Sequence, residues 1–133
     1  KNNLKKIIEN KNINFIGKSN NMLAVYRNID IVVLPSWREG LSKSLLESAS
    51  MSLPIITTDV PGCNDIIKNG YSGILVPIRD KINLKKAIQK YLKDPTLALN
   101  YGKNARNFVV EKFSLEKINN QILNIYDELI NKK

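Results

Sequence analysis

The stretch from Asp30 to Thr58 reads DIVVLPSWREGLSKSLLESASMSLPIITT and predicts two strands joined by one helix. Its first strand, Ile31 to Leu34, is a continuous apolar run that ends at Pro35, a pattern typical of a strand buried on both faces. A second buried strand is predicted at residues 53–58, and the apolar spacing from Leu41 to Ser52 predicts a helix between the two. Strand, helix and strand in this order indicate parallel pairing through a right-handed crossover.

The same alternation continues on both sides of this stretch. A short apolar run at residues 12–16, closed by Gly17, and another at residues 73–77 predict two further strands. Apolar residues at helical spacing predict the remaining helices, which lie near residues 4–8, 21–29, 65–69, 84–92, 97–112 and 114–131. Strands separated by short helices indicate an α/β fold with a doubly wound parallel sheet, followed here by a helical carboxyl terminus.

Composition limits the class of protein. The chain has 133 residues, of which 43% are hydrophobic, enough for one domain with a buried core. Its formal charge of +9 favours anionic partners, but the lysines are scattered rather than clustered with aromatic residues, so no nucleic-acid partner is expected. The sequence contains a single cysteine, Cys63, and no histidine, which excludes an internal disulfide framework and histidine catalysis.

These features fit a cytoplasmic protein. A single cysteine suits a reducing compartment, and no apolar run approaches the ~20 residues needed to span a bilayer. The positive charge is compatible with a peripheral contact at the inner face of the membrane. Because the chain opens with Lys1 directly in a helix-like segment, we expect it to be a piece of a longer protein.

Ligands of parallel α/β sheets bind at the carboxyl ends of the strands, in the turns that lead into helices. Three turns qualify, which span residues 17–21, 35–43 and 58–65. The second is the richest in functional groups, and its Gly40 allows the backbone to approach a ligand closely. The free N–H groups of Leu41, Ser42 and Lys43 would point out of the helix start, where the helix dipole favours an anion such as a phosphate.

Two glutamates, Glu39 and Glu47, flank this turn, and two interpretations of them stay open. Both match the S-x-x-E capping box, with Ser36 and Ser44 as caps, in which the glutamate only returns a hydrogen bond to its cap. If Ser42 caps the helix instead, Glu39 lies in the loop and Glu47 lies inside the helix, near enough its start to reach a ligand. Two acceptors beside an anion site suit a ligand with an anionic middle and hydroxylated ends, such as a nucleotide sugar.

The residues from Leu34 to Pro77 carry a resemblance to a known family. Their Pro-Ser pair, the two glutamates separated by seven residues, and the strand that reads PIITTDVPG resemble the nucleotide-sugar-binding core of the retaining glycosyltransferases of family four. The likeness extends more loosely over residues 12–129, nearly the whole chain. It implies the two-domain GT-B fold. Residues 1–133 would form its Rossmann-like carboxyl-terminal domain, without the first elements of that domain and without the amino-terminal acceptor domain.

The resemblance also implies an activity and a set of site residues. The enzyme would transfer a sugar from a nucleotide diphosphate to a glycan or lipid-linked acceptor, with retention at the anomeric carbon, as in bacterial surface polysaccharide synthesis. It implies no metal and no cofactor besides the nucleotide-sugar donor. Glu39 would be the catalytic-site residue and would hold hydroxyls of the donor sugar, while Glu47 would bind the ribose hydroxyls. The backbone of Gly40, Leu41 and Ser42 would meet the phosphates and the sugar.

Other functions stay open beside this one. In the family, the Arg and Lys that hold the diphosphate lie on elements that would precede Lys1, and neither Arg38 nor Lys43 can be assumed to replace them. We therefore expect this chain alone to transfer no sugar, and a non-catalytic nucleotide- or phosphate-binding module is the alternative. A glycoside hydrolase, which also uses paired carboxylates, is a second rival.

Smaller features carry expectations of their own. Residues 61–65 form either a turn with Asn64 as a helix N-cap or a part of the active site. Trp37 is expected to pack against the sheet, with shelter of the site as the alternative, and Cys63 is expected to be a small loop or core residue. In the resemblance the last helix crosses back to the missing domain, so we expect one apolar face of it to be partly uncovered, the face of Ile118, Ile122, Ile125 and Leu129.

Overall fold

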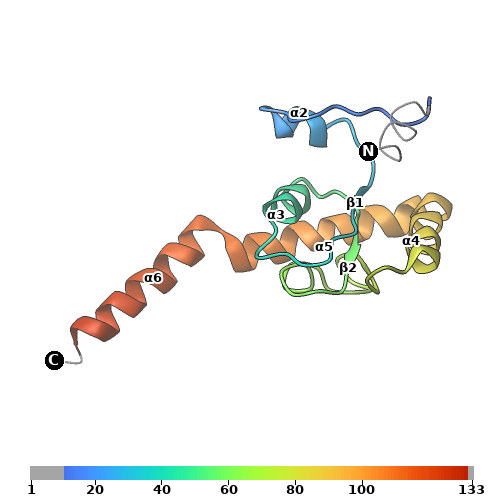
Figure 1. The fold of residues 1–133 in the computed structure, drawn as a ribbon. Coiled ribbons are helices and arrows are strands. Elements are labelled where there is room, and N and C mark those ends of the chain that lie inside the picture. Colours follow the sequence, from blue (N-terminus) through green and yellow to red (C-terminus); the bar gives the residue numbers. More distant parts are fainter. Residues whose placement is uncertain (1–10, 132–133) are drawn as a thin grey trace.

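A three-stranded parallel sheet forms the centre of the protein, seen in a computed structural model that describes residues 11–131 (Figure 1). Its order is β1-β2-β3, with both pairs parallel, and the strands are β1 (Val32–Leu34), β2 (Ile55–Thr58) and β3 (Ile74–Val76). The helices are α2 (Met22–Tyr26), α3 (Lys43–Ser50), α4 (Lys81–Lys93), α5 (Pro95–Phe113) and α6 (Leu115–Ile130). The helix predicted near residues 4–8 lies outside the described residues.

Helices cover both faces of the sheet, which confirms the doubly wound α/β prediction. The consecutive residues Ile55 and Ile56 of β2 are both fully buried, and they belong to two separate core clusters. Ile55 lies with Leu45 of α3 and Val109 of α5, whereas Ile56 lies with Tyr91 of α4. Because successive side chains of a strand point to opposite faces, this division places α3 and most of α5 on one face and α4 on the other.

The position of each strand in the sheet decides how deeply it is buried. All four residues of β2 are buried, as predicted for a strand with helices on both faces. The same prediction for β1 is wrong in part, because the side chain of Val33 is 38% exposed. Among the described residues, β1 has a strand partner on one side only, and its outer edge leaves Val33 partly open to solvent.

The strand predicted at residues 12–16 does not form. Ile13, Phe15 and Ile16 of this segment are 44%, 68% and 59% exposed, and they pair with no strand of the described part. Figure 1 shows the segment together with α2 apart from the sheet. A strand depends on a neighbour for its backbone hydrogen bonds, so an apolar run without a neighbouring strand has no reason to adopt that form.

The helix predicted at residues 65–69 is also absent. A series of turns takes its place, in which the Asn64 amide N–H donates to Val60 at 3.1 Å and that of Ile67 donates to Cys63 at 2.9 Å. Asn64 therefore caps no helix, and its side chain donates to Asp59 at 2.8 Å.

The three carboxyl-terminal helices agree with the predicted pattern to within a few residues. Their N-caps are Asp80, Asp94 and Ser114, whose side chains accept from the backbone N–H three residues later at 2.9, 2.9 and 3.4 Å. Figure 1 shows α6 projecting away from the sheet. Ile122, at 46%, and Leu129, at 63%, are exposed, which confirms that its apolar face is uncovered.

Candidate functional site

The loop between β1 and α3 lies at the carboxyl end of the sheet and contains most of the predicted site residues. Glu39, Gly40 and Leu41 lie in this loop, and Ser42 is the N-cap residue of α3, which begins at Lys43. Glu47 follows on the second turn of the helix. A helix start at Lys43 rules out Ser44 as its cap, so the capping-box interpretation of Glu47 is wrong.

The capping interpretation of Glu39 is wrong as well, because no helix begins at Ser36. The two residues do touch, since the Ser36 hydroxyl donates to the Glu39 carboxylate at 2.7 Å. This is a contact between side chains inside a loop, and it orients the carboxylate without capping a helix. One oxygen of Glu39 is thereby partnered, and a carboxylate retains room for further donors.

The start of α3 is open on the side of Gly40 and Leu41, whereas its N-cap residue Ser42 is buried. Ser42 makes no side-chain capping bond to the helix, and its hydroxyl lies 3.2 Å from that of Ser44 instead. A Cβ atom added to Gly40 would meet nothing within 4 Å, so this side of the loop faces open space. Free backbone amides at a helix start together with an open glycine give the loop the chemistry of an anion site.

Glu47 is held by two neighbours. The Tyr26 hydroxyl donates to Oε2 at 3.2 Å, and the Lys43 ammonium lies 3.5 Å from Oε1. The Glu47 side chain is 35% exposed, so it remains accessible while both contacts are made. Burial and the negative charge of Glu47 raise the pKa of Tyr26, which keeps the hydroxyl protonated and able to donate.

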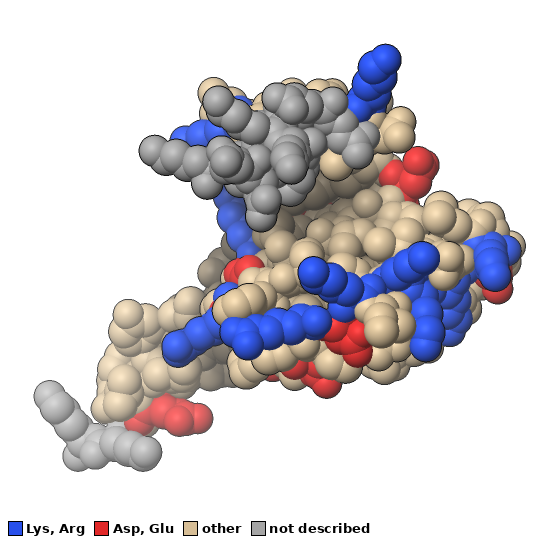
Figure 2. Space-filling view, turned by 45° about the vertical axis from the view of Figure 1, so that its right-hand side comes forward, with Lys and Arg blue, Asp and Glu red and all other residues tan. Residues whose placement is uncertain are grey.

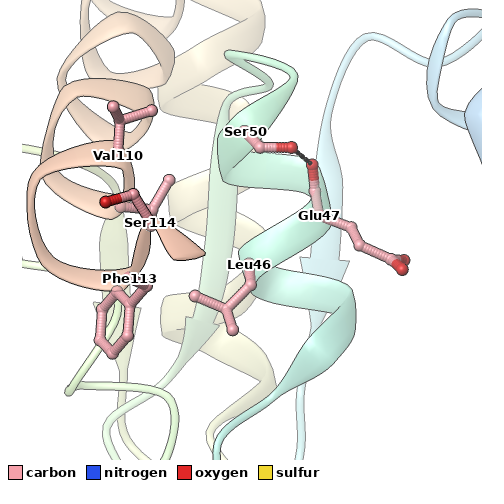
Figure 3. Close-up of a pocket in the computed structure, with 7 residues that line it drawn as sticks. Leu46, Glu47, Ser50, Val110, Phe113 and Ser114 are labelled. Carbon is pink, nitrogen blue, oxygen red and sulfur yellow. Dashed lines mark hydrogen bonds between the residues drawn. The ribbon is translucent and has the colours of Figure 1, made fainter. Parts of the chain in front are cut away.

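An apolar pocket of about 310 Å³ adjoins Glu47 on the other side of α3 (Figure 3). It lies between α3 and the end of α5, with Leu46, Val110 and Phe113 in its wall. Figure 3 shows the carboxylate of Glu47 pointing away from Leu46 and Phe113. Glu47 thus lines the pocket, but its carboxylate lies on the opposite side of the helix, where it accepts a hydrogen bond from Tyr26.

The end of β2 and the turn that follows it contact the end of β1 and the Glu39 loop. The Thr57 hydroxyl donates to the Leu34 carbonyl at 2.8 Å, and the Thr58 hydroxyl donates to the Ser36 carbonyl. Gly62 packs on the loop so closely that a Cβ atom there would lie 1.6 Å from the Gly40 carbonyl oxygen. Its backbone φ of 83° also favours glycine. The turn at residues 61–65 therefore has a packing role against the predicted site.

The prediction that Trp37 packs against the sheet is wrong. Its side chain is 65% exposed, and the Arg79 guanidinium lies over its ring at 4.1 Å from the centroid. Arg79 comes from the turn between β3 and α4, so turns that follow all three strands meet at the Glu39 loop. Arg79 is not among the site residues that the sequence predicts. The available signal was its place two residues after the fourth predicted strand, at the same edge of the sheet.

Cys63 belongs to the turn at residues 61–65, beside the Glu39 loop. Cys63 is fully buried, as expected for a core residue, and burial is the main cause that raises the pKa of its thiol.

Figure 2 shows lysine and arginine side chains spread over one face with acidic residues between them. Across residues 11–131, no group of three or more His, Cys, Asp or Glu is arranged to hold a metal ion. No helix in the same range is long and apolar enough to cross a membrane.

Comparison with known proteins identifies the family. Residues 1–108 match the profile of the family described as glycosyl transferases group 1. The chain is 29% identical to the capsular polysaccharide biosynthesis glycosyltransferase CapM of Staphylococcus aureus, over 93% of this chain and 33% of that protein. It is 31% identical to the UDP-Gal:alpha-D-GlcNAc-diphosphoundecaprenol alpha-1,3-galactosyltransferase of Escherichia coli, over 92% of this chain and 32% of that protein.

The fold has solved counterparts as well. Sucrose-phosphate synthase from Thermosynechococcus elongatus aligns with a TM-score of 0.86 and 29% identity, over 99% of this chain and 35% of that one. The chain thus spans about a third of the length of the proteins it matches. The family match covers most of the chain, and the solved counterpart has the same sheet and helices. The chain therefore belongs to the glycosyl transferases group 1 family and corresponds to the carboxyl-terminal part of a GT-B enzyme.

Proposed function

We propose that residues 1–133 form most of the nucleotide-sugar-binding domain of a retaining glycosyltransferase. The complete enzyme transfers the sugar of a nucleoside-diphosphate donor to a glycan or lipid-linked acceptor, in bacterial surface polysaccharide synthesis. An amino-terminal domain completes the acceptor site. The names of two relatives support this assignment, since one acts in capsular polysaccharide biosynthesis and the other takes its acceptor on diphosphoundecaprenol.

The observation that carries the proposal is the arrangement of carboxylates around the open start of α3. Glu39 precedes the uncapped amides and Glu47 follows them one turn inside the helix. In the proposal the amides of Gly40, Leu41 and Ser42 meet the diphosphate, whose negative charge the helix dipole stabilises. Glu39 then accepts hydrogen bonds from the donor sugar, and Glu47 accepts them from the ribose hydroxyls.

Catalysis in this proposal rests on positioning and electrostatics. The bond from the anomeric carbon to the diphosphate oxygen breaks, and the acceptor hydroxyl oxygen forms a bond to that carbon on the same face. The proton of the acceptor hydroxyl passes to the departing diphosphate. Negative charge grows on the departing diphosphate, and donors that point to that position lower the barrier because they need no reorganisation during the reaction. As the family resemblance implies, the reaction proceeds without a metal ion. Glu39, beside the reacting sugar, holds the ring in the orientation that the acceptor can attack.

The Glu47 contacts are compatible with this role. Tyr26 and Lys43 engage one carboxylate oxygen each, and an ionised carboxylate has about four acceptor positions. Two ribose hydroxyls can therefore bind without displacing Tyr26. A glycoside hydrolase has less support, because such an enzyme needs two carboxylates that face each other across a cleft. Here Glu39 lies in the loop and Glu47 lies on α3, on either side of a helix start.

Titration of the chain with UDP by calorimetry tests the donor site directly. We expect binding that Glu47→Ala weakens and that Glu111→Ala leaves unchanged. Glu111 is a matched control because it also lies on a helix and pairs with a lysine, Lys112, at 3.2 Å. Equal affinities of the wild-type chain and Glu47→Ala would refute the assignment of Glu47.

The chain alone should turn over no nucleotide sugar, and a complete enzyme that binds the donor but transfers nothing would establish the binding-module alternative.

A further inference from the structure

The loop that contains Glu39 has no regular secondary structure, so contacts with its neighbours decide its conformation. One of these contacts comes from the end of β2, where the Thr58 hydroxyl donates to the Ser36 carbonyl. Another comes from the turn after β2, where Gly62 lies against Gly40. They fix the two ends of the loop. The stretch between these ends contains Trp37. A third contact positions the Trp37 side chain, and it comes from Arg79 in the turn between β3 and α4.

Trp37 is not held by core packing. Its side chain is 65% exposed, and a pocket of about 220 Å³ lies beside it, with Thr58, Val76 and Leu84 among the other residues of its wall. A large aromatic side chain next to unfilled space can adopt several rotamers unless another group restrains it. The Arg79 guanidinium, 4.1 Å from the ring centroid, is such a group, because a cation over the face of an indole is attracted by its electron-rich surface.

The backbone around Arg79 is fixed on both sides. Val76 of β3 is nearly fully buried, and Asp80 caps α4 by accepting from the Asn83 N–H at 2.9 Å. Between these two anchors Arg79 has a φ of 60°, in the left-handed region where a side chain is strained and glycine is favoured. A strained residue with an ordered contact is often part of a functional arrangement, because a glycine at that place would fold more easily.

We propose that Arg79 is a positioning residue for the donor site. By stacking on Trp37 it holds the middle of the Glu39 loop against the edge of the sheet, so that Glu39 and the amides of Gly40 to Ser42 are oriented before the donor arrives. This inference rests on the proposed function, since it gives Arg79 a role in donor binding through the loop. Arg79 itself touches no donor in this proposal, and its effect passes through Trp37.

The chain contains one tryptophan, so the fluorescence of Trp37 reports on this loop directly. Arg79→Gly removes the guanidinium and suits the backbone φ, whereas Arg79→Lys retains a cation. Ser52→Gly is the matched control, because Ser52 has a φ of 59° and has no part in the stack on Trp37. Without nucleotide, we expect acrylamide to quench Trp37 more strongly in Arg79→Gly than in the wild type. Ser52→Gly should be quenched as the wild type is.

Titration with UDP then measures the consequence for the donor site. We expect Arg79→Gly to weaken binding about two- to fivefold, the factor that one exposed cation–π contact supplies, and Arg79→Lys to recover part of the loss. The melting temperature of Arg79→Gly should equal or exceed that of the wild type, since relief of the strained φ offsets the lost contact. A purely structural role of Arg79 would instead lower the melting temperature and leave UDP affinity unchanged.

The outcomes separate this inference from the proposed function. If the wild type binds UDP and Arg79→Gly binds it equally well, the positioning role is refuted while the donor site stands. If Arg79→Gly leaves the quenching of Trp37 unchanged, the stack does not order the loop and the inference is refuted as well. If the wild type binds no UDP, the donor site fails and the positioning role fails with it.

Discussion

The hydroxyl of Tyr26 donates a hydrogen bond to the carboxylate of Glu47 at 3.2 Å, across 21 residues of sequence. The same hydroxyl also lies 3.4 Å from the Ser44 carbonyl, and the Tyr26 side chain is only 6% exposed. This contact joins α2 to α3, although Figure 1 shows α2 apart from the sheet. Tyr26 thereby connects the amino-terminal segment to the residue that we assign to ribose binding.

Removal of this hydroxyl should free the Glu47 side chain. We expect Tyr26→Phe to lower the free energy of unfolding by about 1 kcal/mol, because a hydrogen bond to a partly exposed carboxylate is lost while the ring stays buried. UDP affinity should fall severalfold as the carboxylate becomes mobile. Chemical denaturation and UDP calorimetry measure the two effects. Tyr71→Phe is a suitable control, since Tyr71 is 55% exposed and lies outside the site. An unchanged UDP affinity of Tyr26→Phe would show that Glu47 needs no such support.

Substitution of the two glutamates in a complete enzyme should separate their roles. Glu47→Ala should raise the donor KM about tenfold to a hundredfold, because it removes a charge-assisted contact that is made equally before and during the reaction. Glu39→Ala should lower kcat as well, since Glu39 lies beside the reacting sugar. Steady-state kinetics and melting temperatures of Glu39→Ala, Glu47→Ala and Glu47→Gln measure this. A loss of stability in Glu47→Ala with a donor KM within about twofold of the wild type would assign Glu47 a structural role only.

Gly62 should tolerate no side chain. In Gly62→Ala the new Cβ would lie 1.6 Å from the Gly40 carbonyl oxygen, so either the turn or the Glu39 loop must move. We expect a loss of about 2–4 kcal/mol in the free energy of unfolding, from overpacking and the unfavourable φ together. Gly70→Ala is the matched control, because Gly70 has a φ of 75° but nothing within 4 Å of the added atom. Similar losses in both variants would mean that the contact with Gly40 contributes little.

Stability should fall in acid partly through Asp80. Hydrogen bonds from the Asn83 backbone and side chain lower the pKa of Asp80 below its ordinary value. A carboxyl group with a lowered folded-state pKa stabilises the fold above its unfolded pKa, and this contribution disappears as the pH falls through the folded pKa. We therefore expect Asp80→Asn, which can still cap α4 but does not titrate, to lose less stability than the wild type. Thermal melts from about pH 6 to about pH 2.5 measure the difference, and parallel acid profiles would contradict it.

The uncovered face of α6 should promote self-association of the chain. Ile122, Ile125 and Leu129 are 46%, 58% and 63% exposed on a helix that projects from the domain. Apolar side chains gathered on one helix face favour contact with another apolar surface. Sedimentation velocity at high concentration should show dimers or larger species that Ile122→Lys disperses. Asn120→Lys, with the same added charge on the opposite face, should not disperse them. A wild-type chain that stays monomeric would exclude this.

Local sequence signals were sufficient for most of the fold. Three of the predicted strands and the helices α3, α4, α5 and α6 form where periodicity places them, because a buried β-branched run and a 3.6-residue apolar repeat each favour one conformation. The short helix predicted at residues 65–69 is the exception after Lys43. With Ser42 as the N-cap residue, the spacing of Glu39 and Glu47 places one carboxylate in the loop and one in the helix. These features depend on neighbouring residues, which the sequence shows directly.

Contacts between distant residues could be decided only by the tertiary structure. The apolar run at residues 12–16 has a strand pattern but no neighbouring strand to bond with, and the pattern cannot reveal that a partner is missing. The stack of Arg79 on Trp37 and the bond from Tyr26 to Glu47 join residues from different elements. Periodicity determines which side of an element is apolar, whereas only the packed sheet brings the turns after its strands together, because their approach depends on strand order and register.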